Sequence, residues 1–174
     1  DLIFKAIENG KHIITANKAL IAHHGNEIFA AAKAKGVTVA FEAAVAGGIP
    51  IIKAIREGLA ANKIEWLAGI INGTGNFILT EMRDKGRSFD DVLAEAQALG
   101  YAEADPTFDV EGIDAAHKLV ILASLAFGIP LAIDKVFTEG ITKIATEDVT
   151  YAEELGYRIK NLGIARRTDK GIEL

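Results

Sequence analysis

The sequence contains no cysteine among its 174 residues. This absence excludes disulfide bonds and thiolate metal sites, and it favours a reducing compartment. A membrane-spanning helix needs about 18 or more consecutive apolar residues, and the chain has no uncharged apolar run of that length. No secretory signal peptide opens the chain either. We therefore expect a cytoplasmic protein with no membrane partner.

Basic residues are few and scattered. Lys and Arg total 19 against 24 Asp and Glu, which gives a net charge of −5 at pH 7, and the longest basic run is the pair Arg166–Arg167. Nucleic-acid-binding surfaces cluster their Lys and Arg, so no nucleic-acid partner is expected. Half of the residues are hydrophobic, which is enough to build the core of one sizeable domain.

Helices and strands alternate in the first 43 residues. We predict helices over residues 1–10, 18–22 and 26–35, and β-branched strands over residues 11–16 and 37–43. This alternation is typical of a parallel α/β sheet. The chain begins inside a predicted helix without a starting Met and stops in a predicted strand, so we expect a piece of a longer protein.

The remaining sequence predicts a mixture of helices and strands. Ser88 is a good helix N-cap, and residues 102–112 lack a helical period and indicate a loop. The predicted helices cover residues 49–59, 74–84, 89–99, 114–127 and 148–155; the predicted strands cover residues 64–71, 135–138 and 157–167, with a turn at residues 169–171 into a last strand.

The segment EADPTFDVEGIDAAHKL concentrates acids ahead of an apolar helix. It contains, in order, Glu103, Asp105, Asp109, Glu111, Asp114 and Lys118. The helix that follows is apolar on every face, which predicts burial. Buried charges need partners or a ligand. A lysine among carboxylates suits acid/base chemistry, and the remaining carboxylates suit a substrate ammonium.

Two other interpretations stay open at this point. Asp114 and Lys118 are four residues apart and could form an ordinary ion pair on one helix face, with acids favoured there by the helix dipole. A Mg²⁺ or Ca²⁺ site is a weaker alternative, because the acids lack the alternating spacing of a calcium-binding loop.

Several blocks of the sequence resemble the homoserine dehydrogenase family, and they occur in the family's order. They are GKHIITANKALIA (10–22), FEAAVAGGIPII (41–52), INGTGNFIL (71–79), LGYAEADP (99–106) with the acidic segment after it, and ELGYRIKNLGIARR (154–167). The resemblance covers essentially the whole chain. It implies reversible hydride transfer between NAD(P)H and L-aspartate 4-semialdehyde, which gives L-homoserine on the route to threonine, methionine and isoleucine.

The resemblance also implies an α/β (α+β) fold. Residues 1–46 would be the C-terminal part of a Rossmann-like NAD(P)-binding domain. Residues 47–156 would form a substrate-binding, catalytic and dimerisation domain, in which helices pack on one face of a mixed β-sheet. Residues 157–174 would be returning strands, truncated. A homodimer is expected, because the family dimerises through this region.

The dinucleotide fingerprint G-x-G-x-x-G is missing from the chain. By the resemblance it belongs to a region of about 90 residues upstream. Hydride transfer needs the nicotinamide held in register with the substrate, so the 174-residue chain alone is expected to have little or no dehydrogenase activity. The alternative function is a noncatalytic amino-acid-binding or dimerisation module on the same scaffold.

The acidic segment contains the substrate contacts that the resemblance implies. Lys118 would give a proton to the carbonyl oxygen, and Glu103, Asp109 and Asp114 would contact the substrate. The two weaker candidates, Asp105 and Glu111, are expected to have loop or structural roles.

Four other residues receive roles near the ligands. Lys18 would lie near nicotinamide and substrate, although an exposed helix lysine is the simpler interpretation. Gly100 would touch the dinucleotide, and it would also suit the end of a helix. Gly73 and Thr74 are placed at the edge of the substrate, because helix-start N–H groups suit carboxylate or carbonyl oxygens. A tight turn that needs glycine explains Gly73 equally well.

The loop EAAVAGGIP offers oxygen ligands. By the resemblance, a monovalent cation, sodium, would be bound by the carboxylate of Glu42 and the backbone carbonyls of Val45, Gly47 and Ile49. Oxygen-only ligation suits a hard cation. A flexible hinge between domains is the alternative interpretation of this loop.

Overall fold

The computed structural model describes residues 2–174; residue 1, where the predicted opening helix begins, lies outside the described residues. The chain divides into two compact units, each built from segments that are distant in the sequence. Unit 1 contains the residues up to Leu67, together with His117–Val136 and Ile164–Leu174; unit 2 contains Ala68–Ala116 and Phe137–Gly163.

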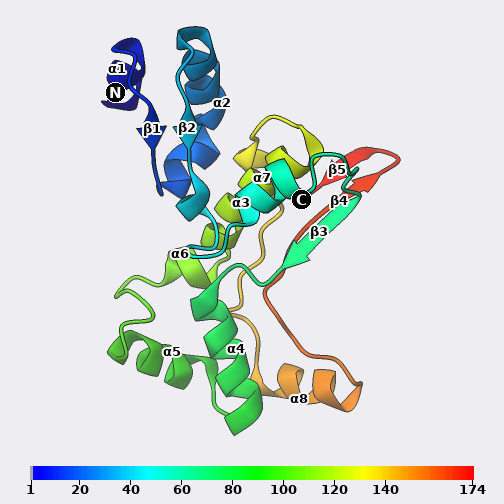
Figure 1. Cartoon of the computed structure of the whole chain (residues 1–174). Helices are drawn as coiled ribbons and strands as arrows, with labels where there is room; N and C mark the ends of the chain where they lie inside the picture. The colour runs from blue at the N-terminus through cyan, green and yellow to red at the C-terminus, as the bar shows by residue number, and fades with distance from the viewer. Residues whose placement is uncertain (1) are drawn as a thin grey trace. The chain divides into compact units, whose positions relative to one another are not determined.

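Unit 1 opens with the predicted α/β alternation. Helix α1 (Leu2–Glu8) leads to strand β1 (Ile13–Ile14), helix α2 (Lys18–Lys35) and strand β2 (Val39–Ala40). The two strands pair in parallel, with Ile13 opposite Val39 and Ile14 opposite Ala40, and they lie side by side in Figure 1. Parallel strands need a crossover connection, which α2 provides. The α/β prediction is therefore confirmed.

Helix α2 is one continuous helix, so the prediction of two helices here is wrong. Asn17 caps its start by accepting the N–H of Leu20 (3.0 Å), and Gly36 ends it in a left-handed conformation with φ 65°. Gly25 lies in the helix interior. A Cβ there would collide with Leu131 Cδ1, so the glycine is needed for the close approach of Leu131.

The rest of unit 1 is mostly helical. After β2 come a 3-10 turn η1 (Glu42–Ala44), helix α3 (Ile51–Lys53) and a π-helical turn η2 (Ala54–Gly58). The unit takes in most of helix α7 (Ile113–Phe127) and the 3-10 turn η3 (Ile133–Lys135). No strand forms over residues 135–138 of the described chain, so that prediction is wrong. The core of unit 1 includes Ile7, Ile21, Ile28, Val45, Val120 and Ile121.

A second sheet has the strand order β3-β4-β5, formed by β3 (Trp66–Gly69), β4 (Gly163–Thr168) and β5 (Gly171–Glu173). Strands β4 and β5 form an antiparallel hairpin in which Thr168 lies opposite Gly171, as the predicted turn requires. The strand predicted over residues 157–167 begins only at Gly163. Residues 157–162 are irregular, so the first half of that prediction is wrong.

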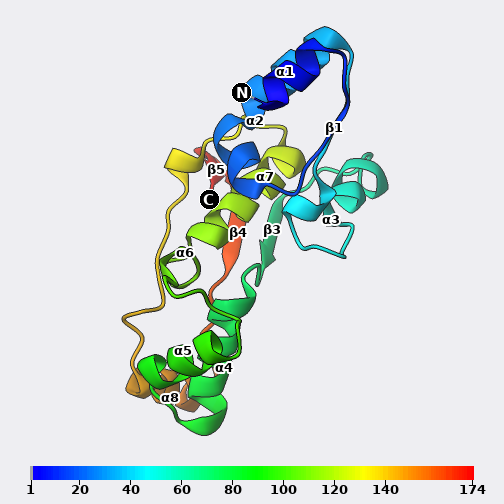
Figure 2. The same ribbon diagram turned by 90° about the vertical axis from the view of Figure 1, so that its left-hand side faces the viewer.

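Unit 2 is a helical cluster built around α4 (Gly73–Lys85). Helices α5 (Phe89–Ala98) and α8 (Thr146–Glu154) lie beside α4 in both views (Figures 1 and 2). Ser88 caps α5 by accepting the N–H of Asp91 (3.3 Å), as predicted. The loop expected over residues 102–112 contains one helical turn, α6 (Thr107–Val110). The core consists of Ile78, Leu79, Met82, Val92, Val110, Ile141 and Val149.

Candidate active site

The start of α4 brings together acids from α6 and from the first turn of α7, all of them residues of unit 2. Asn72 precedes α4 and is its N-cap, because its Oδ1 accepts the N–H of Gly75 (2.7 Å). Its Nδ2 donates to Asp109 Oδ1 (2.7 Å) in α6 and to Asp114 Oδ2 (3.0 Å) in the first turn of α7. One buried side-chain amide therefore joins two of the carboxylates that the sequence nominated. Sequence reasoning gave Asn72 no role.

Burial strengthens the electrostatic interactions among these three side chains. Asp114 is 5% exposed and Asn72 is 4% exposed, while Asp109 is half-buried. Two carboxylates that share one site repel each other, and donors of hydrogen bonds offset that repulsion. Carboxylate oxygens accept hydrogen bonds from cationic donors as well as from amides. Such a pair attracts a cationic group such as an ammonium.

The other acids of the segment have different surroundings. Glu103 is exposed, and its backbone carbonyl accepts a hydrogen bond from Gln97 (3.0 Å). Asp105 accepts the N–H of Thr107 (3.1 Å) at the start of α6. Hydrogen bonds from the side chain and backbone of Thr107 lower the pKa of Asp105. The structure thus places Glu103 at the surface and gives Asp105 a local contact.

Glu111 joins two segments of unit 2. Its Oε1 accepts a hydrogen bond from the Thr142 hydroxyl (2.9 Å). The adjacent Gly112 is left-handed (φ 79°), and a Cβ there would lie 3.2 Å from the Glu139 carbonyl oxygen. The N–H of Ile141 donates to the Val110 carbonyl (2.8 Å). The link between α6 and α7 is therefore held closely by the chain around residues 139–142.

Gly73 and Thr74 begin helix α4 of unit 2, and Gly100 lies in the turn after α5. Gly73 is the exposed first residue of α4. The Thr74 hydroxyl donates to the Tyr101 carbonyl (2.8 Å), which joins the start of α4 to the segment after α5. Gly100 follows α5 with φ 77°, a conformation that favours glycine. The Tyr101 ring meets Phe77 edge-on at 5.4 Å.

The two candidate lysines belong to unit 1. Lys118 lies one turn after Asp114 along α7, which places them on the same helix face. Lys118 is half-buried. The residues of α7 that follow it are mostly buried, as predicted. Lys18 is also half-buried and is the first residue of α2, just beyond the carboxyl end of β1. The rings of His23 and His117 meet edge-to-face at 5.0 Å, and they join the two helices that carry these lysines.

Comparison with known proteins decides the family. A family model described as homoserine dehydrogenase matches residues 50–174, which is more than half of the chain. A second model, described as the NAD binding domain of homoserine dehydrogenase, matches residues 1–42. The chain belongs to the homoserine dehydrogenase family.

Individual relatives agree with this assignment. The homoserine dehydrogenases of Pseudomonas aeruginosa and Neisseria gonorrhoeae are 79% and 67% identical over 174 residues, which is all of this chain and 40% of each relative. The crystal structure of the Thiobacillus denitrificans homoserine dehydrogenase matches with a TM-score of 0.97 and 74% identity, over 98% of this chain and 40% of that one. A hyperthermophilic archaeal homoserine dehydrogenase in complex with NADPH matches with a TM-score of 0.79 and 30% identity, over 99% and 50%. The chain therefore spans about 40% of the length of the curated relatives.

The loop nominated for sodium contains a helix cap that sequence reasoning missed. The two carboxylate oxygens of Glu42 accept the N–H groups of Ile52 (2.8 Å) and Lys53 (2.9 Å) at the start of α3. Val45 is buried, and Ile49 is 62% exposed. Glu42 is ten residues upstream of Ile52, so the sequence alone could have identified it only as a favourable charge near the start of a helix.

The oxygen atoms of the same loop are chemically suited to a hard cation. Gly47 is exposed, and the Ile49 carbonyl accepts the N–H of Ile51 (2.8 Å). Within residues 2–174, no group of three His, Cys, Asp or Glu side chains gathers as a set of metal ligands. Over the same residues, no helix combines the length and apolar character needed to cross a membrane.

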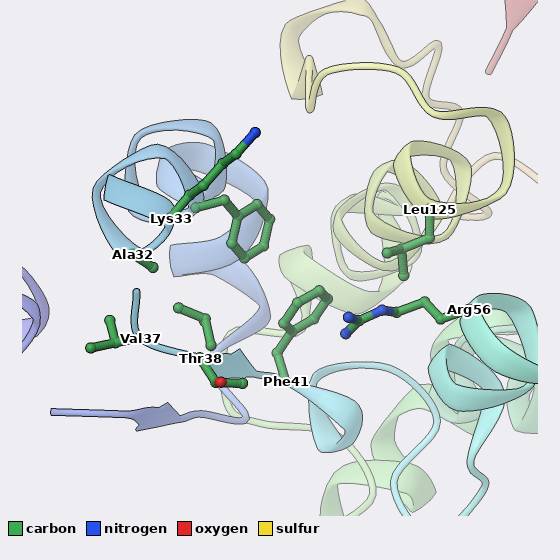
Figure 3. A pocket seen from close by; sticks show the side chains of 9 residues that line it. Ala32, Lys33, Val37, Thr38, Phe41, Arg56 and Leu125 are labelled. Carbon is green, nitrogen blue, oxygen red and sulfur yellow. The ribbon is translucent and has the colours of Figure 1, made fainter. Parts of the chain in front are cut away.

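Unit 1 contains a pocket of about 380 Å³, whose lining side chains are drawn in Figure 3. Its walls come from α2, the segment around β2, η2 and α7, and the side chains are mainly apolar, with Arg56 directed toward Phe41. The rings of Phe29 and Phe41 stack at 5.3 Å. None of the residues nominated from the sequence lines this pocket.

Proposed function

We propose that this chain carries the substrate site of an NAD(P)-dependent homoserine dehydrogenase, which interconverts L-aspartate 4-semialdehyde and L-homoserine. Family membership supports the reaction, and the observation that carries the site is the Asn72 amide bonded to Asp109 and Asp114. An amino-acid substrate brings an ammonium that needs carboxylate acceptors. Its aldehyde oxygen gains negative charge in the reaction and needs a donor.

In the direction of reduction, a hydride adds to the aldehyde carbon and a proton adds to its oxygen. NAD(P)H supplies the hydride when it is bound. Lys118 donates the proton from Nζ, and Asp109, Asp114 and Glu103 contact the substrate. Gly73 and Thr74 border the substrate at the start of α4. In the reverse direction Lys118 takes the proton back.

The nicotinamide cofactor is proposed to lie against the first segment of the chain. In parallel α/β sheets, ligands bind outside the carboxyl ends of the strands. The carboxyl end of β1 leads into α2, whose first residue is Lys18. We assign Lys18 to the catalytic residues and, with Gly100, to cofactor contact, and residues 1–46 to the end of an NAD(P)-binding domain. The NAD-binding match over residues 1–42 supports this division.

The test is turnover by the full-length gene product. Purified protein is supplied with L-homoserine and NAD or NADP, and NAD(P)H absorbance is followed. A panel of other hydroxy amino acids identifies the preferred substrate. Homoserine-dependent reduction of the cofactor is the expected result. Homoserine binding by calorimetry without turnover would instead favour a noncatalytic amino-acid-binding module, and preference for another hydroxy amino acid would favour a different oxidoreductase.

A homodimer is proposed as the assembly. Trp66 on β3 is 67% exposed and Ile164 on β4 is 45% exposed. A groove of about 480 Å³ beside Trp66 is lined mainly by apolar residues, among them Ile51, Ile55 and Leu59. Exposed apolar surface of this kind is typical of protein interfaces. Light scattering of the full-length gene product is expected to give twice the monomer mass, and a monomer at high concentration would contradict the proposal.

Sodium is the cation proposed for the loop of Glu42, Val45, Gly47 and Ile49. The support is chemical: one carboxylate and three carbonyls are hard oxygen donors. Replacing sodium chloride by choline chloride at equal ionic strength is expected to lower the melting temperature. An unchanged melting temperature would count against a bound ion.

A further inference from the structure

We infer that Asn72 is a positioning residue: its amide orients the carboxylates of Asp109 and Asp114 as a two-carboxylate clamp for the substrate ammonium. The inference rests on the proposed function and deepens it. Asn72 acts through these carboxylates and is given no contact with the substrate. The three residues come from the start of α4, from α6 and from the first turn of α7, all within unit 2.

The hydrogen bonds fix the amide in one orientation. A side-chain amide has two N–H donors and one carbonyl acceptor. The acceptor takes the N–H of Gly75 at 2.7 Å. The donors reach Asp109 Oδ1 at 2.7 Å and Asp114 Oδ2 at 3.0 Å. A flipped amide would turn its oxygen toward both carboxylates and its NH₂ toward a backbone N–H, so the flipped state is excluded.

The amide also makes the carboxylate pair electrostatically tolerable. Two like charges that share a buried site disfavour each other's ionised form. Hydrogen bonds donated to a carboxylate favour that form and are stronger than neutral ones. Asn72 donates one to each partner without adding charge of its own. Each carboxylate thus has a neutral donor in Asn72, and carboxylate oxygens are suitable acceptors for a substrate ammonium.

The backbone beneath the clamp is held independently of Asn72. Gly112, between α6 and α7, packs against the Glu139 carbonyl, and Ile141 bonds to the Val110 carbonyl at 2.8 Å. These contacts set where the two helices begin and end. Loss of the amide donors is therefore expected to disturb the orientation of the carboxylates more than the fold.

The decisive variant is Asn72→Asp. Aspartate is as good an N-cap as asparagine, so the bond to the Gly75 N–H is retained. The two donors are replaced by an oxygen that repels Asp109 and Asp114. Near pH 8 the variant is expected to raise KM for L-homoserine at least about tenfold, as loss of hydrogen bonds to charged groups implies. Its Kd for NADP is expected to stay unchanged.

The pH profile separates this role from a merely structural one. As pH falls, the introduced carboxyl takes up a proton and regains an O–H donor. The KM defect of Asn72→Asp relative to wild type is therefore expected to shrink toward acidic pH. The matched control is Ser88→Ala, which removes the N-cap of α5 in the same unit. This control is expected to lower the melting temperature while leaving KM and its pH profile unchanged.

Each outcome decides the inference. An unchanged KM in Asn72→Asp, or a KM defect that Ser88→Ala reproduces, overturns it. If Asn72→Asp does not fold, Asn72→Ser keeps an N-cap oxygen without the two amide donors, and the same KM rise is expected. If the wild type binds homoserine without turnover, the proposed reaction fails, but calorimetry still tests the clamp by comparing homoserine Kd between wild type and Asn72→Asp. Absence of homoserine binding to the wild type overturns both.

Discussion

Removing the carboxylate of Glu42 should destabilise unit 1 by exposing the uncapped start of α3. Both oxygens accept helix N–H groups, from Ile52 at 2.8 Å and from Lys53 at 2.9 Å. Hydrogen bonds to charged groups contribute about 1.5–3 kcal/mol each when buried, and the half-buried position of Glu42 reduces this to about 1 kcal/mol each. Glu42→Ala is therefore expected to lower the free energy of unfolding by about 2 kcal/mol, and Glu42→Gln, which keeps one acceptor oxygen, by about 1 kcal/mol.

Thermal and urea unfolding of the full-length gene product measure this effect. A loss of about 2 kcal/mol corresponds to a fall in Tm of about 4–8 °C for a domain of this size. Glu57→Gln is the matched control, because Glu57 is exposed and pairs with Lys53 only at the surface (3.8 Å). Parallel unfolding experiments in sodium chloride and in choline chloride distinguish the helix cap from a bound ion. Loss of the cap lowers the stability equally in both salts, whereas loss of an ion site lowers it only in sodium chloride. A Glu42→Ala protein as stable as the control would refute the capping argument.

Two further substitutions test packing and charge. Gly25→Ala is expected to destabilise the protein by about 1–3 kcal/mol, because its Cβ would press on Leu131; an unchanged urea midpoint would contradict this packing. Arg87→Gln is expected to lower Tm at neutral pH, because hydrogen bonding to Arg87 lowers the pKa of Asp91. A depressed carboxyl pKa stabilises the fold above the unfolded-state pKa and ceases to do so as pH falls through the folded value. The Tm difference should therefore shrink as pH falls through the lowered pKa of Asp91, and a constant difference at all pH values would reject this role for the pair.

Elements with strong local signals were predictable from the sequence. Helix α5 follows a serine N-cap, and the hairpin between β4 and β5 follows a turn with glycine at residue 171. These signals act within a few residues of the chain. The predicted strand over residues 157–162 had no such support, because strand assignment depends on a partner. In the structure, pairing begins only at Gly163.

Helix α2 shows where a local rule gives way to tertiary packing. Glycine in a helix interior is destabilising by about 1 kcal/mol relative to alanine, so the sequence predicts a break near Gly25. Asn26 makes two hydrogen bonds with the backbone of Leu131, at 2.8 and 3.0 Å. These bonds and the close approach of Leu131 outweigh the propensity. They involve residues 105 positions apart, which no local window contains.

The residues of the candidate site also divide into those that the sequence indicates and those that only the fold brings into contact. The acids of the 103–114 segment were nominated because their charge and their position before an apolar helix are visible in the sequence. Asn72 was not nominated, because an asparagine before a helix indicates an N-cap and nothing more. Its bonds to Asp109 and Asp114 span 37 and 42 residues. They exist only once α6 and the first turn of α7 lie beside the start of α4.

The most direct test of the account is the turnover of Lys118 variants. Homoserine oxidation is measured in the full-length gene product for wild type, Lys118→Ala and Lys118→Arg. If Lys118 transfers the proton, Lys118→Ala lowers kcat by about 10²-fold or more with a modest change in KM. Lys118→Arg stays nearly as slow, because a guanidinium keeps the charge but does not give up its proton. Unchanged turnover in either variant would contradict proton transfer by Lys118.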